Sequence, residues 1–229
     1  MLLLLAILHV AQAAPDLTGS WGLEMQTTVA AKLPVIGDLR TTSTTRILIQ
    51  LTPDGDQWTA HHEVCQTQTN SKIVKTEIPD TYIAAIPKKT YPVNVDSRAG
   101  VDHFALDMRP FFMGFDPATC GSPPEDPDSP CLVDADSDGH PGVTIRVRPP
   151  LFSWMEVYVA QTSRTLLDGV VVNGSEIAGT VEVRDATTTV LGATRSMFAH
   201  SPKTRILQDE SAFVMKRIKV DATCADVRQ

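Results

Sequence analysis

Hydrophobic and polar residues alternate along most of this chain. In residues 46–51 the apolar Ile47, Ile49 and Leu51 occupy every second position, and residues 180–184 repeat the pattern. Successive side chains of a β-strand point to opposite faces, so alternation with period two predicts strands that bury one face. No segment shows the period of a long amphipathic helix, and the pattern predicts an all-β protein.

Further runs of strand length are separated by residues that favour turns. Asn173-Gly174 lies between two such runs and has the composition of a type I′ hairpin turn. The total is roughly eight to ten strands, which suits an antiparallel β-barrel or a sandwich. The other predicted strands are 20–29, 72–78, 81–86, 101–108, 143–148, 155–160, 187–198 and 212–219.

One segment interrupts the strand pattern. Residues 109–142 contain seven of the chain's 16 prolines, and proline cannot donate a hydrogen bond within a central strand. We interpret this segment as an excursion inserted into a single β-barrel domain of residues 14–229.

The N-terminus predicts export. The apolar run from Leu2 to Val10 is too short to cross a bilayer and is followed by Ala11-Gln12-Ala13, which has the form of a signal-peptidase cleavage site. Residues 1–13 are therefore predicted to be a signal peptide, and the protein to be secreted or periplasmic. No later run has the length and apolar character of a transmembrane segment.

The four cysteines become disulfide candidates in an oxidising compartment. Three pairings of Cys65, Cys120, Cys131 and Cys224 are conceivable. Cys120 and Cys131 flank a short segment rich in proline, aspartate and serine that has little capacity to fold without a cross-link. We therefore predict Cys120–Cys131 and, by elimination, Cys65–Cys224, with four reduced thiols as the alternative.

Net charge excludes one class of partner. The chain has 20 Lys and Arg against 27 Asp and Glu, which gives a formal charge of −7. A surface of that sign repels phosphate backbones and anionic lipids, so a nucleic-acid-binding function is not expected.

The residues Asp16-Leu17-Thr18-Gly19-Ser20-Trp21 resemble the Gly-x-Trp opening of lipocalin-like (calycin) barrels. The resemblance implies an eight-stranded barrel in which Trp21 closes one end and an arginine of the last strand, here Arg217, lies across the indole. It also implies a disulfide from the C-terminal tail to a body strand, as Cys65–Cys224 would form. The alternative is another barrel or sandwich in which Trp21 is a core aromatic residue.

An acidic motif predicts a metal site. Asp134, Asp136 and Asp138 occupy positions 1, 3 and 5 of a loop with glycine at position 6, the arrangement in which oxygen ligands surround Ca²⁺. The backbone carbonyl of His140 would be a further ligand. Position 12 is isoleucine rather than the glutamate of an EF-hand, so we expect a structural calcium loop with weak, extracellular-range affinity. The alternative is a solvated acidic turn.

An apolar cluster in the excursion is the candidate ligand contact. Phe111, Phe112, Met113 and Phe115 must bury their side chains against the protein's own core, a ligand at the barrel mouth, or a partner. The favoured interpretation is a lid packed on the protein's own core, and the resemblance to lipocalin-like barrels implies that this lid would border a ligand cavity.

Local catalytic motifs are absent from the sequence. His61, His62 and Glu63 form the one tight cluster of titratable residues, but on a strand His62 would face away from the other two, so a solvated face is favoured over a metal site. An enzyme is therefore not the favoured interpretation, although a hydrolase assembled from distant residues leaves no local trace.

Two functions remain in view from the sequence. The leading hypothesis is a secreted or periplasmic β-barrel that binds a small hydrophobic ligand and is stabilised by calcium. The runner-up is a calcium-stabilised structural module whose interior is filled by side chains. The sequence indicates no protein partner and no particular ligand.

Overall fold

The computed structural model describes residues 15–33, 37–55 and 57–228. It is an all-β structure with a single antiparallel sheet of 11 strands, which confirms the predicted fold class. The predicted signal peptide, residues 1–13, lies outside the described residues. No helix in the described part of the chain is long and apolar enough to cross a membrane.

The elements follow one another with short connections except between β6 and β7. In chain order they are β1 (Gly19–Leu33), β2 (Gly37–Asp54), β3 (Gln57–Ser71), β4 (Lys75–Glu77), α1 (Asp80–Ala85), β5 (Lys89–Arg98), β6 (Val101–Met113), β7 (Val143–Arg148), β8 (Met155–Asn173), β9 (Glu176–Ala193), the 3-10 turn η1 (Ser196–Phe198), β10 (Lys203–Ile206), the 3-10 turn η2 (Gln208–Glu210), β11 (Ala212–Arg217) and α2 (Cys224–Val227).

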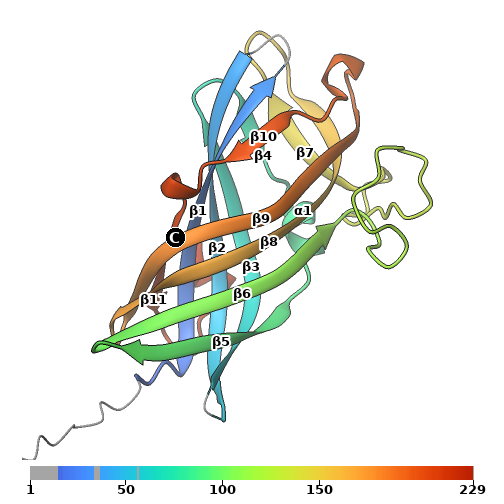
Figure 1. Cartoon of the computed structure of the whole chain (residues 1–229). Coiled ribbons are helices and arrows are strands. Elements are labelled where there is room, and N and C mark those ends of the chain that lie inside the picture. The colour runs from blue at the N-terminus through green and yellow to red at the C-terminus, as the bar shows by residue number, and fades with distance from the viewer. Residues whose placement is uncertain (1–14, 34–36, 56, 229) are drawn as a thin grey trace, which may run out of the picture.

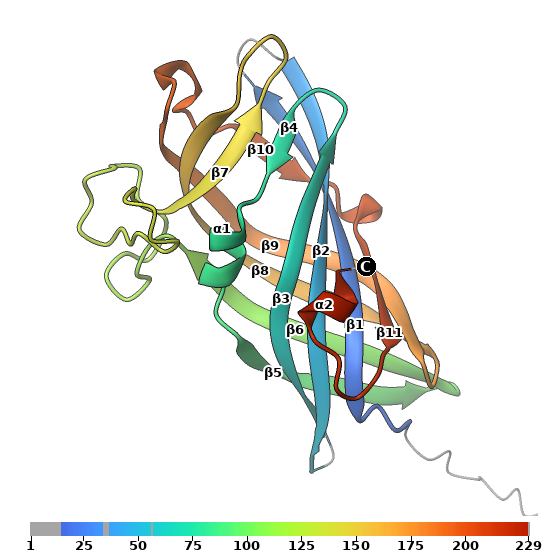
Figure 2. The same ribbon diagram turned by 180° about the vertical axis from the view of Figure 1, so that it is seen from behind.

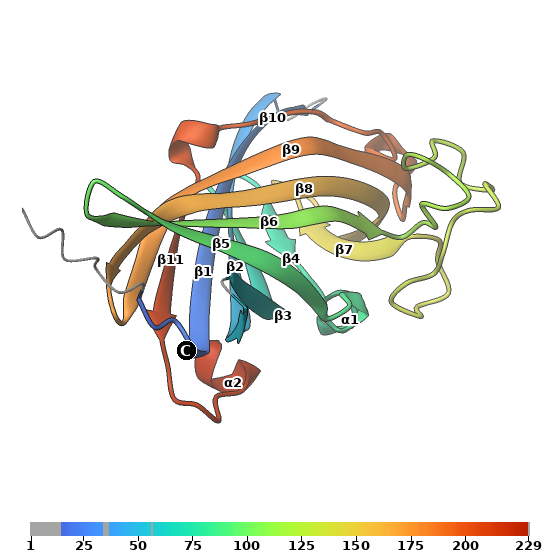
Figure 3. The same cartoon turned by 60° about the horizontal axis from the view of Figure 1, so that its bottom comes forward.

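Strand pairing closes the sheet on itself. The pairs run β1–β2–β3–β5–β6–β8–β9–β11, and β11 pairs again with β1, so these eight strands form a ring. In Figure 1, β1, β2 and β3 run steeply while β5, β6, β8 and β9 cross them, and Figure 3 shows the ring from a second direction. We call the space that it encloses the ring interior.

A second connection joins β3 to β8 through β4 and β7.

The helix α1 lies between β4 and β5 (Figure 2). The prediction of a strand at 81–86 is therefore wrong. Pro79 precedes the helix in an extended conformation, and Asp80 lies in the first helical turn, where a negative charge is favourable. One helical turn then suffices to bury Tyr82 and Ile83 together.

The excursion begins later than the prolines predict. β6 continues to Met113, so the segment without a long strand is 114–142 rather than 109–142. Pro110 fits because the register of β6 against β8 shifts between Asp107 and Pro110, and Arg109 has a φ of 51°. A bulge of this kind frees the proline from a ladder hydrogen bond. The excursion projects from the side of the ring (Figure 1).

The hairpin at Asn173-Gly174 forms between β8 and β9, but its turn is not type I′. Neither Asn173 nor Gly174 has a positive φ. Instead, Oδ1 of Asn173 accepts hydrogen bonds from the backbone N–H and the hydroxyl of Ser175, at 2.8 and 2.7 Å. This Asx-type closure replaces the left-handed backbone of a type I′ turn.

Both predicted disulfides are confirmed. Cys120–Cys131 cross-links the excursion, and Cys65–Cys224 joins β3 to α2. Cys65 is the extra residue of a bulge in β3, because Gln66 pairs with Arg46 and Val64 pairs with Ile47. α2 packs outside β2 and β3 (Figure 2).

One end of the ring interior is filled by large apolar side chains. We call this part the Trp21 half. Apart from Leu17, which precedes β1, it is built from alternate residues of the eight ring strands, as the period-two pattern predicts. Its largest fully buried members are Leu17, Trp21, Leu23, Ile47, Ile49, Leu51, Phe104, Leu106, Leu167, Ile177, Phe213 and Met215.

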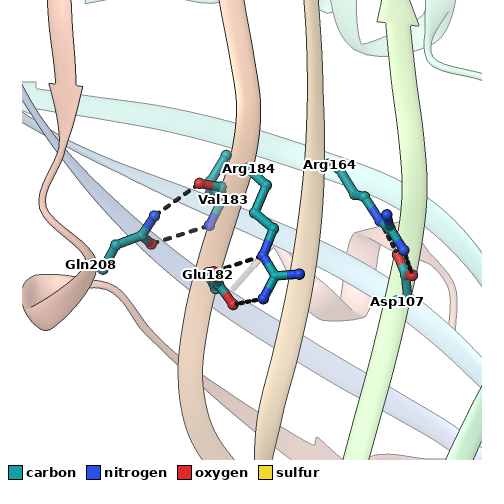
Figure 4. A network of polar contacts seen from close by, with 6 residues as sticks. All are labelled: Asp107, Arg164, Glu182, Val183, Arg184 and Gln208. Carbon is teal, nitrogen blue, oxygen red and sulfur yellow. Dashed lines mark hydrogen bonds and ion pairs between the residues drawn. The ribbon is translucent and has the colours of Figure 1, made fainter.

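The outer face of the ring is polar. On β6 and β8, the guanidinium of Arg164 binds the carboxylate of Asp107, with Nε 3.0 Å from Oδ1. On β9, Arg184 binds Glu182 at 2.7 Å (Figure 4). Arg164 and Arg184 on this face thus each have a carboxylate partner.

Candidate functional site

The Trp21 end of the ring is closed by the contact that the resemblance to lipocalin-like barrels implies. Arg217 is the register partner of Trp21, and its guanidinium carbon lies 4.6 Å from the centroid of the indole. The guanidinium also donates to the carbonyls of Asp16, Thr18 and Gly174. Gly19 has a φ of 124°, and a side chain there would press on Arg217.

The other part of the ring interior is hollow. A cavity of about 560 Å³ begins where the packed core ends, and we call this part the cavity half. Every strand except β11 contributes to its wall, as does α1. The size falls within the range of small-molecule sites, about 300 to 1,000 Å³. A groove of about 590 Å³ also lies against β3 and β4, but it is lined mainly by threonine, glutamine, asparagine and charged side chains.

The cavity wall is largely apolar next to the core and carries hydroxyls further along the strands. The apolar residues on the wall are Met25, Val29, Ile47, Val64, Ile78, Ile86, Pro87, Met108, Phe111, Ile145, Val147, Val183, Ala186 and Ile206. The hydroxyl residues include Thr27, Thr41, Ser43, Thr45, Thr67, Thr69, Thr76, Thr162, Ser163, Thr165 and Thr188.

Two basic side chains, a histidine and a lysine, also lie on this wall. His62 on β3 and Lys89 on β5 are register partners, and both line the cavity. His62 is 8% exposed, and burial lowers its pKa to about 4, so the imidazole is neutral at pH 7. Its Nδ1 atom is buried and has no partner among the described residues.

Lys89 extends over an aromatic ring of the same wall. Its ammonium lies 5.7 Å from the ring centroid of Phe111, and burial lowers the pKa of this lysine. Tyr91, the next inward residue of β5, packs edge-on against His62 with 5.6 Å between the ring centroids. We call His62, Lys89 and Tyr91 the polar corner of the cavity half.

Tyr82 of α1 also reaches the cavity wall. Its hydroxyl is hydrogen-bonded to the side-chain amide of Gln161 on β8, and burial raises the pKa of this tyrosine. The contact joins α1 to β8 of the ring.

The structure separates the four apolar residues that the sequence groups together. Phe111 lines the cavity. Met113 is buried with Tyr82 of α1. Phe112 and Phe115 pack edge-on against each other, 5.8 Å apart, beside the Cys120–Cys131 disulfide at the base of the excursion. Only Phe111 of the four contributes to the cavity wall.

The acidic loop brings its three carboxylates together. Asp134, Asp136 and Asp138 each offer an oxygen within 4.8 Å of the other two, the one such group of potential metal ligands in the described part of the chain. The backbone has left-handed φ values at Ser137 (58°) and Gly139 (89°), which turn the loop around the carboxylates. The three residues could therefore hold a metal ion.

Five of the six carboxylate oxygens in this loop accept hydrogen bonds within the loop or from Thr144. The sixth, Oδ1 of Asp136, is buried and has no partner among the described residues. Asp136 is 7% exposed, and burial followed by the charges of Asp138 and Asp134 raises the pKa of this carboxyl. A bound cation would supply the missing partner.

The side chain of His140 points out of this group and stacks on Tyr158, with the ring centroids 4.1 Å apart. The predicted metal contact of His140 is through its backbone carbonyl, and it stays a prediction. The stacking ties the loop to β8, next to the point where the excursion re-enters the sheet at Val143.

Sequence reasoning did not identify His62, Lys89 and Tyr91 as a group. The alternating pattern contained a signal, since His62 falls between the inward positions Ala60 and Val64 of its strand. The register of β3 against β5 supplies the rest of the information, and this register is a property of the folded sheet.

The chain matches no protein-family model, and no significant similarity to a curated protein or to a solved structure is found. Inferences about function therefore rest on the residues and geometry described above.

Proposed function

We propose that this protein binds a small hydrophobic molecule in the cavity half of the ring interior. The observation that carries the proposal is the cavity itself, about 560 Å³ with largely apolar walls, continuous with a tightly packed core. Empty apolar space of that size forfeits packing contacts, and an apolar ligand restores them. The ligand-free structural module is the outcome expected if nothing enters the cavity.

The test is ligand capture by the purified protein. Native mass spectrometry after detergent-free purification should show an added mass, and the neutral fluorophore N-phenyl-1-naphthylamine should bind and be displaced by apolar compounds. Ser163→Trp places a large side chain in the cavity and should abolish binding. Val172→Trp, on the exposed part of the same strand, is the matched control. Equal binding by both variants would place the fluorophore outside the cavity and contradict the proposal.

We propose that the metal of the acidic loop is Ca²⁺ with a structural role. Hard oxygen ligands on a flexible loop suit this ion better than Mg²⁺, which demands a small, rigid octahedral shell. Bound only by the folded state, Ca²⁺ at ten times its dissociation constant would add about 1.4 kcal/mol of stability. Thermal unfolding with millimolar Ca²⁺, Mg²⁺ or chelator measures this directly.

Asp136→Asn should abolish the increase in melting temperature that Ca²⁺ causes, because it removes the buried negative charge. Asp126→Asn, at an acidic residue of the same excursion outside the carboxylate group, is the control. A wild-type protein that melts at the same temperature in Ca²⁺ and in chelator would contradict the calcium assignment.

We also propose that the protein is secreted or periplasmic. Two disulfides are compatible with an oxidising compartment, where such bonds persist. A relationship to lipocalin-like barrels is likewise a proposal. It is supported by the ring of eight strands and by the Trp21–Arg217 contact at its closed end.

A further inference from the structure

The polar corner of the cavity has a charge without a counter-charge. No aspartate or glutamate lines the cavity, and Lys89 is the one charged side chain among the described residues of its wall. None of the ion pairs found in the described ranges involves Lys89. Lys89 is only half-buried, so water still reaches its side chain, and an anion beside the ammonium would replace the hydration that it loses at the apolar wall.

The neighbouring lysine shows the contrast. Lys88 lies immediately before Lys89 in the chain, points outward and binds Glu63, with its Nζ atom 2.8 Å from Oε2. Arg164 and Arg184 on the outer face also have carboxylate partners (Figure 4). The protein carries a net charge of −7, so carboxylates are abundant, yet none is placed on the cavity wall.

His62 provides the second half of the corner. Its buried Nδ1 atom has no partner in the described part of the chain, and its register places it beside Lys89. The neutral imidazole can present either ring nitrogen as a hydrogen-bond donor. His62 and Lys89 occupy paired positions of β3 and β5 and line the same cavity, so the imidazole can offer an N–H beside the ammonium. Two such donors match the two oxygens of a carboxylate.

We propose that the ligand is an amphipathic carboxylic acid whose carboxylate binds Lys89 and His62 and whose apolar chain lies in the cavity. This inference rests on the proposed function and specifies its ligand class. One lysine beside a neutral histidine balances a single negative charge, which favours a carboxylate over a phosphate monoester. The aliphatic part then contacts Met25, Ile47 and Met108, where the cavity meets the packed core.

The test compares two probes that differ only in the head group. Hexadecanoate and hexadecan-1-ol are titrated against the fluorophore-loaded wild-type protein at pH 7.5. Charge-assisted hydrogen bonds predict about tenfold tighter binding of the acid. Lys89→Met should abolish this preference by weakening hexadecanoate alone, and Lys89→Arg should retain it.

Lys88→Met is the matched control, since it removes the adjacent lysine from the outer face and should keep the preference. The melting temperature of Lys89→Met should equal or exceed that of the wild type, because an unpaired cation leaves the cavity wall. Equal binding of acid and alcohol by the wild type would overturn the ligand class while the hydrophobic cavity function stands. Failure of both probes to displace the bound fluorophore would likewise overturn the ligand class, whereas failure of the fluorophore itself to bind would overturn both proposals.

Discussion

The Trp21 half and the cavity half are built from the same strands but are filled differently. Along β1, Trp21 and Leu23 face the packed core, whereas Thr27 and Val29 face the cavity. β2 shows the same change, from Ile49 in the core to threonines and a serine along the cavity wall. Alternation with period two continues through both halves, while the volume of the inward side chains falls.

The difference shows how the strands can stay paired in the ring while part of the ring interior is left unfilled. Threonine is β-branched and favours the strand conformation, yet it occupies much less space than leucine or tryptophan. Its hydroxyl also bonds across the ladder, as between Thr45 and Thr67, whose oxygens are 3.3 Å apart. Inward threonines therefore preserve the sheet and leave space for a ligand.

Truncating an inward side chain to alanine should distinguish the Trp21 half from the cavity half most strongly. Trp21→Ala removes a fully buried side chain and should lower the free energy of unfolding by about 3 to 5 kcal/mol. Thr27→Ala, on the same strand but facing the cavity, should cost less than about 1 kcal/mol. Urea denaturation of both variants measures the contrast, and similar losses would mean that the halves do not differ in packing.

Acid should destabilise the cavity half through His62. The folded-state pKa of about 4 lies below the unfolded value of 6.5, so the unfolded chain binds the proton more readily. Stability from this group is complete above about pH 7 and is lost as the pH falls through 6.5 toward 4, by up to about 3 kcal/mol in total.

The measurement is the difference in unfolding free energy between the wild type and His62→Gln at pH 7 and pH 4.5. The wild type should lose more stability than the variant over this interval. His61→Gln, which alters the outward histidine bonded to Thr90, is the control and should follow the wild type. Identical pH profiles for the wild type and His62→Gln would show that the buried histidine titrates normally.

Enlarging an inward side chain should destabilise the Trp21 half but should be tolerated in the cavity half. Ala60 is fully buried in the packed core, so Ala60→Leu should overpack it at a cost of about 1 to 3 kcal/mol. Ser163→Leu enters the cavity and should change stability by less than about 0.5 kcal/mol. Thermal melts with apolar ligand removed test this pair, and a destabilised Ser163→Leu would indicate that the cavity is smaller than described.

The smallest expected effect concerns the closed end. The guanidinium of Arg217 over the indole of Trp21 should give a coupling free energy of about 1 kcal/mol in a double-mutant cycle with Trp21→Leu and Arg217→Met, which remove the aromatic face and the charge. Additive effects would show that the arginine acts only through its hydrogen bonds to backbone carbonyls.

Several predictions succeeded because they depend on local chemistry. β7 has the predicted bounds of 143–148, because its alternation is a property of six consecutive residues. The Cys120–Cys131 bridge closes a short loop, and its formation determines the other pair. The acidic group is contiguous in the sequence, so its carboxylates converge through the loop alone. Two predictions failed because they depend on other features. The segment of α1 was predicted to be a strand, and its helix begins after the extended Pro79. β6 ends later than predicted because a bulge accommodates Pro110.

The sequence by itself determined the strand content, because side-chain direction alternates along any strand, and it determined the cysteine pairs and the acidic loop through local chemistry. The contact of Arg217 with Trp21 was an expectation from the resemblance to lipocalin-like barrels. Only the tertiary structure decided that the ring interior is half hollow and that His62 and Lys89 meet on its wall. A cavity is the volume that inward side chains leave unfilled, and that volume depends on the order and register of strands that are distant in the chain.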